Sequence, residues 1–281
     1  MKKTFLVLSV LTILLYACKE DSFLSENPIT ENSTQASQDH LFAENILNDV
    51  GRIVEDGFNN NGLSKSSCIN YKSMASDSSD ADTLIIDFGD IDCLDEYGKL
   101  RRGKVIVIYT APYRDSFAQI TITFDHYYVN STNWIQGSRT VTNLGMNANN
   151  KMLFDIEADI HITTTSGIVD WQTSRTRIWE TGINTALNPF DDKYKVVGNA
   201  SGNGRNGNNF TVTITDTLNV NLGCLQDSIT YNERCVVVSG KVKITPDGHS
   251  AREINYGSGE CNCDFSVTID GRTYPLFVNI E

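Results

Sequence analysis

The chain has 281 residues, 40% of them hydrophobic, which is enough for one large domain or two small ones with a substantial core. Its 23 basic residues stand against 35 acidic ones, so the formal net charge is −12 at pH 7. Nucleic-acid binding requires a basic patch that neutralises phosphates, and no such patch is visible, so nucleic acid is excluded as a partner.

The N-terminus predicts a cleaved lipoprotein signal. Two lysines follow the first methionine, an apolar run spans 5–16, and the sequence LYAC at 15–18 resembles a lipobox. The apolar run is too short to cross a bilayer as a helix, which takes about 20 residues. We therefore expect residues 1–17 to be removed and Cys18 to carry acyl chains that insert into outer-membrane lipid. The alternative is an ordinary secretory signal in which Cys18 occurs by chance.

The residues after Cys18 indicate where the protein goes. The sequence CKED at 18–21 resembles the surface-export signal of lipoproteins in Bacteroidota, in which a lysine and acidic residues directly follow the lipidated cysteine. This resemblance implies a protein that is anchored in the outer membrane and faces the cell exterior.

A tether and a helix are predicted next. Residues 18–38 are rich in Ser, Asn, Thr and Glu, which predicts a flexible tether. Residues 39–62 are predicted to form an amphipathic helix and the turn that ends it. Apolar residues recur there at spacings of three and four, so they form one stripe that must lie against another part of the protein. These residues are Leu41, Phe42, Ile46, Val50, Ile53 and Val54.

Residues 63–281 predict an all-β domain. Runs of Thr, Val, Ile, Tyr and Phe alternate with polar residues and are separated by turn signals such as Asn-Gly and Asp-Gly. Short connections favour antiparallel neighbours, because a parallel crossover needs about a dozen residues or more. We expect a large antiparallel meander, as one twisted sheet or a two-layer sandwich, with the helix closing an edge or a face. The predicted strands cover 68–74, 83–89, 103–111, 117–129, 134–143, 152–163, 169–180, 193–201, 209–221, 235–245, 251–257 and 264–280.

Parts of this domain resemble a known group of proteins. The sequence Asp-Phe-Gly at 87–89 is followed by Cys93, and a stretch rich in Gly and Asn covers 198–209. With the turn pattern, these features resemble a group of β-rich Bacteroidota surface lipoproteins over residues 65–281. The resemblance implies the location and the fold, and it carries no known activity.

Seven cysteines become six once Cys18 is assigned to the lipid, and an even number in an exported chain predicts disulfides. Two of the six flank one predicted hairpin, and four lie in the last 60 residues, so we expect each group to bond internally. The expected pairs are Cys68 with Cys93, Cys235 with Cys261, and Cys224 with Cys263. The alternative for Cys261 and Cys263, two positions apart, is a redox pair or a metal site.

An acidic loop is the candidate metal site. Carboxylate oxygens from a loop suit calcium, the one cofactor that the sequence suggests. The candidate ligands are Asp87, Asp90, Asp92 and Asp95. Their spacing does not follow the EF-hand pattern, and the alternative is a solvated loop that is held by Cys93 and balanced by Arg101, Arg102 and Lys104.

A hairpin carries the candidate binding surface. Alternation places four large side chains on one face of a strand: Trp171, Arg175, Arg177 and Trp179. If odd residues face odd residues across the hairpin, Glu157 and Asp159 of the preceding strand lie beside the arginines and form a ladder of ion pairs. Tryptophan faces with charged neighbours suit sugar binding. The alternative is that the rings cover arginine stems or the helix.

Two short triplets predict modification. Thr217 and Ser228 each follow an aspartate and precede an apolar residue, which is similar to the general O-glycosylation signal of Bacteroidota envelope proteins.

The sequence contains no catalytic motif of a common type. It has no nucleophile elbow, Walker loop, dinucleotide fingerprint or His-Glu-x-x-His, and its four histidines lie in different predicted elements. The sequence therefore predicts a non-enzymatic cell-surface lipoprotein that acts as an adhesin or a glycan-binding accessory, with a glycan or a surface protein as partner. Two alternatives stay open: a carrier whose sheet curls around the helix and shields an apolar ligand, and a hydrolase without a recognisable motif.

Overall fold

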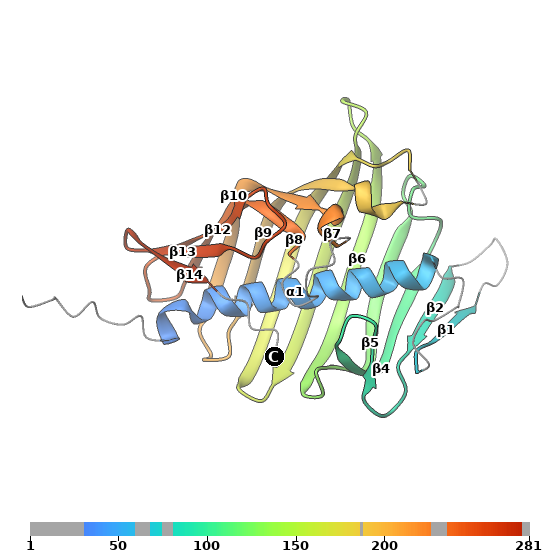
Figure 1. Cartoon of the computed structure of the whole chain (residues 1–281), viewed down its shortest axis with the longest axis horizontal. Helices are drawn as coiled ribbons and strands as arrows, with labels where there is room; N and C mark the ends of the chain where they lie inside the picture. The colour runs from blue at the N-terminus through green and yellow to red at the C-terminus, as the bar shows by residue number, and fades with distance from the viewer. Residues whose placement is uncertain (1–30, 60–67, 75–80, 186–187, 226–234, 277–281) are drawn as a thin grey trace, which may run out of the picture.

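Figure 1 shows the computed structural model of the chain. The residues it describes are 31–59, 68–74, 81–185, 188–225 and 235–276. Within these ranges the chain forms one long α-helix, two short 3₁₀ helices and 14 strands that belong to a single sheet. The predicted fold class, an all-β protein with one N-terminal helix, is confirmed.

The strands follow one another across the sheet in chain order, and all paired neighbours are antiparallel. Strand β3 leaves this path and pairs with β4. The predicted meander is therefore confirmed, and among the described residues it forms one sheet instead of two layers. The strands are β1 (Asn70–Met74), β2 (Asp82–Asp87), β3 (Cys93–Leu94), β4 (Leu100–Tyr109), β5 (Gln119–Val129), β6 (Asn133–Met146), β7 (Met152–Thr164), β8 (Gly167–Thr181), β9 (Lys193–Asn203), β10 (Asn209–Asn221), β11 (Val237–Pro246), β12 (Arg252–Ser258), β13 (Phe265–Ile269) and β14 (Arg272–Leu276).

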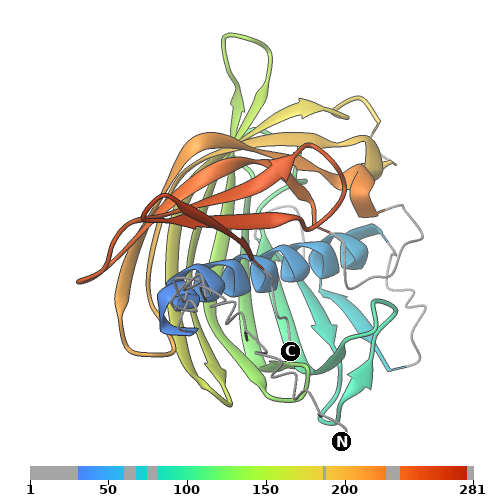
Figure 2. The same ribbon diagram turned by 60° about the vertical axis from the view of Figure 1, so that its left-hand side comes forward.

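The sheet is strongly curved, so one of its faces is a hollow (Figure 2). Breaks in the pairing register contribute to this curvature, because a bulge bends and twists its strand. One break lies between Arg102 and Lys104 of β4. The residue between them, Gly103, has φ of 82°, and a Cβ atom there would lie 2.0 Å from the carbonyl oxygen of His126. Glycine is required at this bulge because it has no Cβ and tolerates positive φ.

Helix α1 (Glu31–Asn59) lies in the hollow and crosses the strands (Figures 1 and 2). All six residues of the predicted stripe are buried, which confirms it. The helix begins at Glu31, so the prediction of a tether up to residue 38 is wrong for 31–38. Polar composition suggested disorder there, but Ala36 and Ser37 are buried in the folded protein. No helix in the described part of the chain is long and apolar enough to cross a membrane.

The strands alternate between a buried inner face and an outer face. In β7 the even-numbered apolar residues of the alternation are all buried, namely Phe154, Ile156, Ala158, Ile160 and Ile162. Strand β4 is apolar on both faces, but only one of them is covered: Val105 and Val107 are buried, whereas Ile108 is 43% exposed. The reason is its position, because β4 is third from one edge of the sheet and the helix covers the inner face alone.

Three disulfides brace the ends of the sheet. The predicted pair Cys68–Cys93 is confirmed, with 5.9 Å between the Cα atoms. The other two predicted pairs are wrong, because the partners are exchanged. The observed bonds are Cys224–Cys261 and Cys235–Cys263, with Cα separations of 5.1 and 5.4 Å. Sequence spacing does not distinguish the observed pairs from the predicted ones, because exchanging Cys261 and Cys263 changes the length of each closed loop by only two residues.

Candidate functional site

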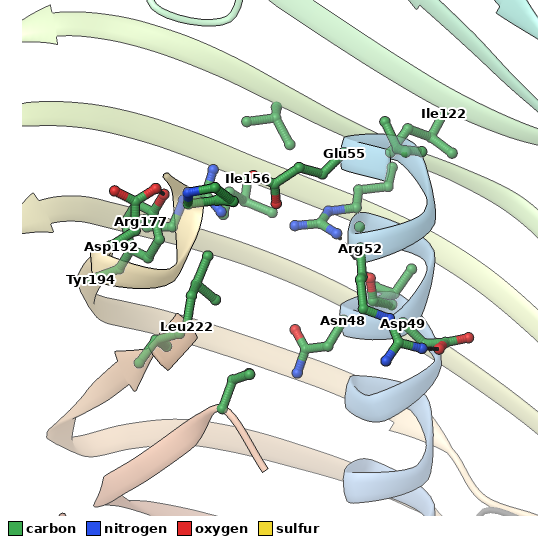
Figure 3. Close-up of a pocket in the computed structure, with 18 of the residues that line it drawn as sticks. Asn48, Asp49, Arg52, Glu55, Ile122, Ile156, Arg177, Asp192, Tyr194 and Leu222 are labelled. Atoms are coloured by element: carbon green, nitrogen blue, oxygen red, sulfur yellow. Dashed lines mark hydrogen bonds and ion pairs between the residues drawn. The ribbon is translucent and has the colours of Figure 1, made fainter. Parts of the chain in front are cut away.

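A cavity lies between α1 and the inner face of the sheet (Figure 3). Its volume is about 1180 Å³, whereas small-ligand pockets usually measure about 300–1,000 Å³. Helix α1 forms one wall, and the other walls come from β2, from β4 to β11, from the loop after β4 and from the short helices η1 (Pro189–Asp191) and η2 (Leu222–Leu225). The cavity therefore exists because the helix lies in the hollow of the curved sheet.

Much of the sheet wall is apolar. Branched aliphatic side chains from successive strands point inward, because each occupies the inward position of its alternating strand. They are Ile120, Ile122, Val141, Ile156, Val196, Leu218, Val220 and Val237, and Leu222 of η2 joins them. Such a wall suits the hydrocarbon part of a ligand.

The helix wall is polar. Asn48, Arg52 and Glu55 are spaced four and three residues apart, so they lie on one face of α1 and line the cavity. Asn48 and Glu55 extend away from the helix, whereas Arg52 turns back along it to Asp49 (Figure 3). Burial, and secondarily the charge of Asp192, raises the pKa of the Glu55 carboxyl.

Arg175 of β8 belongs to a buried polar network with the helix. Its Nη1 lies 2.5 Å from Oε1 of Glu44, and the hydroxyl of Tyr256 donates to Glu44 over 2.6 Å. The indole Nε1 of Trp171 donates to Nδ1 of His40 over 3.1 Å. Burial lowers the pKa of His40 to about 4, so the ring is neutral at pH 7. This network ties the N-terminal half of α1 to the sheet.

Arg177 of β8 lies among aromatic rings. Its guanidinium carbon is 5.0 Å from the ring centre of Phe154 and 4.8 Å from that of Tyr194, and its Nη2 donates to the hydroxyl of Tyr113. Tyr194 donates in turn to Asp192 over 2.9 Å. Faces of aromatic rings attract a cation without neutralising it. Arg177 therefore keeps its charge beside the cavity.

Arg139 of β6 reaches across to the helix. Its Nη1 donates to the carbonyl oxygen of Leu47 over 2.9 Å. Gly51 leaves room for this approach, since a Cβ there would lie 3.0 Å from the same Nη1. Burial, followed by the like charges of Arg177 and Arg175, lowers the pKa of Arg139 to about 10. The side chain is still cationic at neutral pH.

A second polar cluster holds the C-terminal half of α1. Asp49 lies 2.7 Å from Arg101 and 2.9 Å from Lys99, and Arg101 also lies 2.5 Å from Asp95 and donates to Tyr127. Although burial opposes it, the charges of Arg101 and Lys99 hold the pKa of Asp49 below its usual value. All the charges of this cluster are thus matched within the protein.

The acidic loop uses its carboxylates in structural contacts. Asp95 pairs with Arg101, and Asp92 pairs with Arg102 at 2.8 Å. These are the balancing partners that the solvated-loop alternative named, but the Asp95–Arg101 pair is buried instead of solvated. Lys104 departs from that alternative, since it pairs with Asp125. The other two candidates differ: Asp87 accepts from the backbone N–H of Gly89, and Asp90 is exposed. In the described part of the chain no group of three or more His, Cys, Asp or Glu side chains is placed to hold a metal ion.

The predicted binding surface on β8 is turned inward. Trp171 and Trp179 are 1% and 3% exposed, so they form no platform on the protein surface. The predicted ladder of ion pairs is wrong, because odd residues face even ones: Arg175 lies opposite Ile156, and Arg177 opposite Phe154. The alternative, in which the rings cover arginines and the helix, agrees with the contacts of Trp171 to His40 and Arg175.

The remaining predicted sites are scattered. Thr217 lies in β10 beside a break in register and is half-buried. Ser228 and Cys18 fall outside the described residues. His126 of β5 shares the parity of Ile120 and Ile122, but its side chain is 83% exposed, because a bulge between Thr123 and Tyr127 shifts the alternation.

Comparison with protein-family models, with curated proteins and with solved structures finds no match for this chain. The cavity and its residues are therefore the features from which the function can be inferred.

Five arginines line the cavity; sequence reasoning found Arg175 and Arg177 and missed Arg139, Arg52 and Arg114. The signal was present, because Arg139 shares its inward parity with Ile135 and Val141. A charged residue at an inward position of an alternating strand indicates a buried pair or a site. The partners Glu44 and Tyr113 lie far away in sequence and gave no local signal.

Proposed function

We propose that the protein is a carrier that binds an apolar or amphipathic small molecule in the cavity between α1 and the sheet. The observation that carries this proposal is a cavity of about 1180 Å³ with a continuous aliphatic wall inside a sheet that curls around a helix. Burying a hydrocarbon chain there is favourable by about 25 cal/mol for each Å² of apolar surface removed from water.

The adhesin or glycan-binding interpretation has less support. It needs an exposed aromatic surface, and Trp171 and Trp179 are covered by the helix and by neighbouring aromatic rings. The hydrolase alternative also has less support. A hydrolase needs titratable groups clustered at one site, whereas His126 pairs with Asp125 and His161 pairs with Asp170, both at partly exposed sites.

The proposed location is the outer membrane, through acyl chains on Cys18 and with the domain facing the exterior. A lipid anchor would keep the cavity close to a source of amphiphiles. Mass spectrometry of the membrane-extracted protein is expected to find an acylated Cys18 at the mature N-terminus. An intact leader would contradict this location and would leave the cavity proposal untouched.

The carrier proposal is tested with N-phenylnaphthylamine, an uncharged apolar dye whose fluorescence rises in apolar surroundings. The protein is the chain from residue 18 with Cys18→Ser, which removes the anchor and retains every described residue. We expect saturable binding that Val196→Trp abolishes, because Val196 lines the cavity.

The matched control is Val197→Trp, since the next residue of β9 points to the outer face and is 37% exposed. This variant is expected to bind the dye like the parent. If the parent does not bind the dye, or if both tryptophan variants bind it unchanged, the carrier proposal is wrong.

A further inference from the structure

The cations of the cavity differ in whether the protein neutralises them. Arg175 pairs with Glu44, and both Arg52 and Lys99 pair with Asp49. Arg114 makes no ion pair with a carboxylate among the described residues, but it donates to the carbonyl oxygen of Ile183 and its guanidinium lies over the ring of Trp179. Within the described structure, Arg139 and Arg177 likewise make no ion pair with a carboxylate. The guanidinium groups of these two residues, called the arginine pair below, face the same cavity from β6 and β8.

The hydrogen bonds of the arginine pair orient the two guanidinium groups but leave some of their N–H donors without an acceptor. Arg139 donates from Nη1 to the carbonyl of Leu47, and Arg177 donates from Nη2 to the hydroxyl of Tyr113. Nη2 of Arg139 and Nη1 of Arg177 have no hydrogen-bond partner in the described structure and are not buried, whereas the Nε atoms of both are buried without a partner. A guanidinium can donate five hydrogen bonds and accept none. Two NH2 groups, one on each guanidinium, are therefore available to an acceptor in the cavity.

Leaving these charges uncompensated is costly in an apolar surrounding. The carboxylates that face Arg177 do not remove the cost. Glu55 extends from the helix wall (Figure 3) and attracts Arg177 from beyond ion-pair distance, and in the described structure Asp192 makes no ion pair with Arg177 either. Asp192 already accepts hydrogen bonds from Tyr194 and from the indole of Trp179.

Resting on the proposed function, we propose that the ligand is an amphiphile with an anionic group of the carboxylate or phosphate type, which the arginine pair Arg139 and Arg177 binds. The fork of a guanidinium matches both oxyanions, and these charge-assisted hydrogen bonds are stronger than neutral ones. The hydrocarbon chain would lie along the aliphatic wall formed by residues such as Ile156, Val196 and Leu222.

Four amphiphiles with the same twelve-carbon chain test this assignment by displacing N-phenylnaphthylamine, each below its micelle concentration. They are dodecanoate, dodecyl phosphate, dodecanol and dodecylamine. Both anions are expected to displace the dye at least about tenfold more effectively than the alcohol, and the amine least effectively. The preferred anion tells whether the site is built for a carboxylate or for a phosphate head group.

Variants then assign the preference to the arginine pair. Arg139→Gln and Arg177→Gln should each weaken the binding of the anions about tenfold and leave dodecanol unchanged. Glu55→Gln should strengthen anion binding, because it removes a facing carboxylate. Arg102→Gln is the matched control, since Arg102 pairs with Asp92 outside the cavity.

The outcomes separate the two proposals. If the dye does not bind, the carrier function itself fails. If the dye binds but dodecanol displaces it as well as dodecanoate does, the cavity is a carrier site and the anionic ligand is wrong. If the two Gln variants lower the unfolding midpoint in urea and keep the parent's preference for anions, the arginine pair is structural, and the assignment is overturned.

Discussion

The indole nitrogen of Trp171 on the sheet donates a hydrogen bond of 3.1 Å to Nδ1 of His40 on the helix. An indole N–H can only donate, so Nδ1 must accept and the single proton of the neutral ring lies on Nε2. A second proton would place two donors against each other at a fully buried site. The contact between helix and sheet is therefore tied to the protonation state of His40.

This relation predicts an acid-sensitive fold. The pKa of His40 is lowered from 6.5 to about 4 by burial, so between these values the unfolded chain binds a proton that the folded chain does not. Stability must then fall as the pH falls, by about 2 kcal/mol between pH 7.5 and pH 5 from this one group. Urea unfolding at a series of pH values measures the slope.

The His40→Gln variant provides the comparison, because it removes the titrating group and retains a side chain that can accept from Trp171. Between pH 7.5 and pH 5, the free energy of unfolding of His40→Gln should therefore fall by about 2 kcal/mol less than that of the parent. His126→Gln is the control at an exposed histidine and should keep the parent slope. Equal slopes in the parent and His40→Gln would show that burial of His40 carries no such effect.

The ion pair of Glu44 and Arg175 predicts a second effect on stability. Removing one partner of a buried pair leaves an uncompensated charge, which typically costs about 3–5 kcal/mol. Glu44→Gln should therefore lower the free energy of unfolding by about 3 kcal/mol, and adding Arg175→Met should restore much of the loss. Urea unfolding of the two single variants and the double variant measures the coupling. Additive losses would contradict a direct pair.

The overall fold was predictable because its signals are local. Alternation in β7 identified the strand and its inner face, and the stripe in α1 identified the buried side of the helix. The curvature was not predictable in the same way, because it depends on bulges such as the one at Gly103. The start of the helix was also missed, since the burial of Ala36 and Ser37 arises only in the folded protein and leaves no local signal in the sequence.

The sequence indicated which residue types belong to the site, but it did not indicate which residues contact one another there. The register of β7 and β8 is set by their short turn, in which Thr164 lies opposite Gly167, and this makes odd residues face even ones. That register turns Arg175 and Arg177 towards the helix instead of towards Glu157. Glu44, the actual partner of Arg175, lies on a different element, and no spacing rule connects a helix to the strand it crosses.

The exchanged disulfides give a chemical prediction. Because Cys224 bonds with Cys261, the variant Cys261→Ser should leave Cys224 as a free thiol and keep Cys235–Cys263 intact. Alkylation of the denatured, unreduced variant followed by peptide mapping identifies the labelled cysteine. Labelling of Cys235 would show that the pairing expected from the sequence is the real one.

The bulge of β4 makes a prediction that separates two costs of replacing a glycine. Gly98 and Gly103 have nearly equal φ values of 77° and 82°, but no atom lies within 4 Å of a Cβ built on Gly98, whereas a Cβ on Gly103 would meet the His126 carbonyl oxygen at 2.0 Å. Gly98→Ala should cost about 1–2 kcal/mol for the left-handed backbone alone. Gly103→Ala should cost clearly more, because the paired strand must also move, and the curvature around the cavity should change with it. Urea unfolding and binding of N-phenylnaphthylamine measure the two consequences, and equal losses of stability in the two variants would mean that the close approach at the bulge does not constrain the sheet.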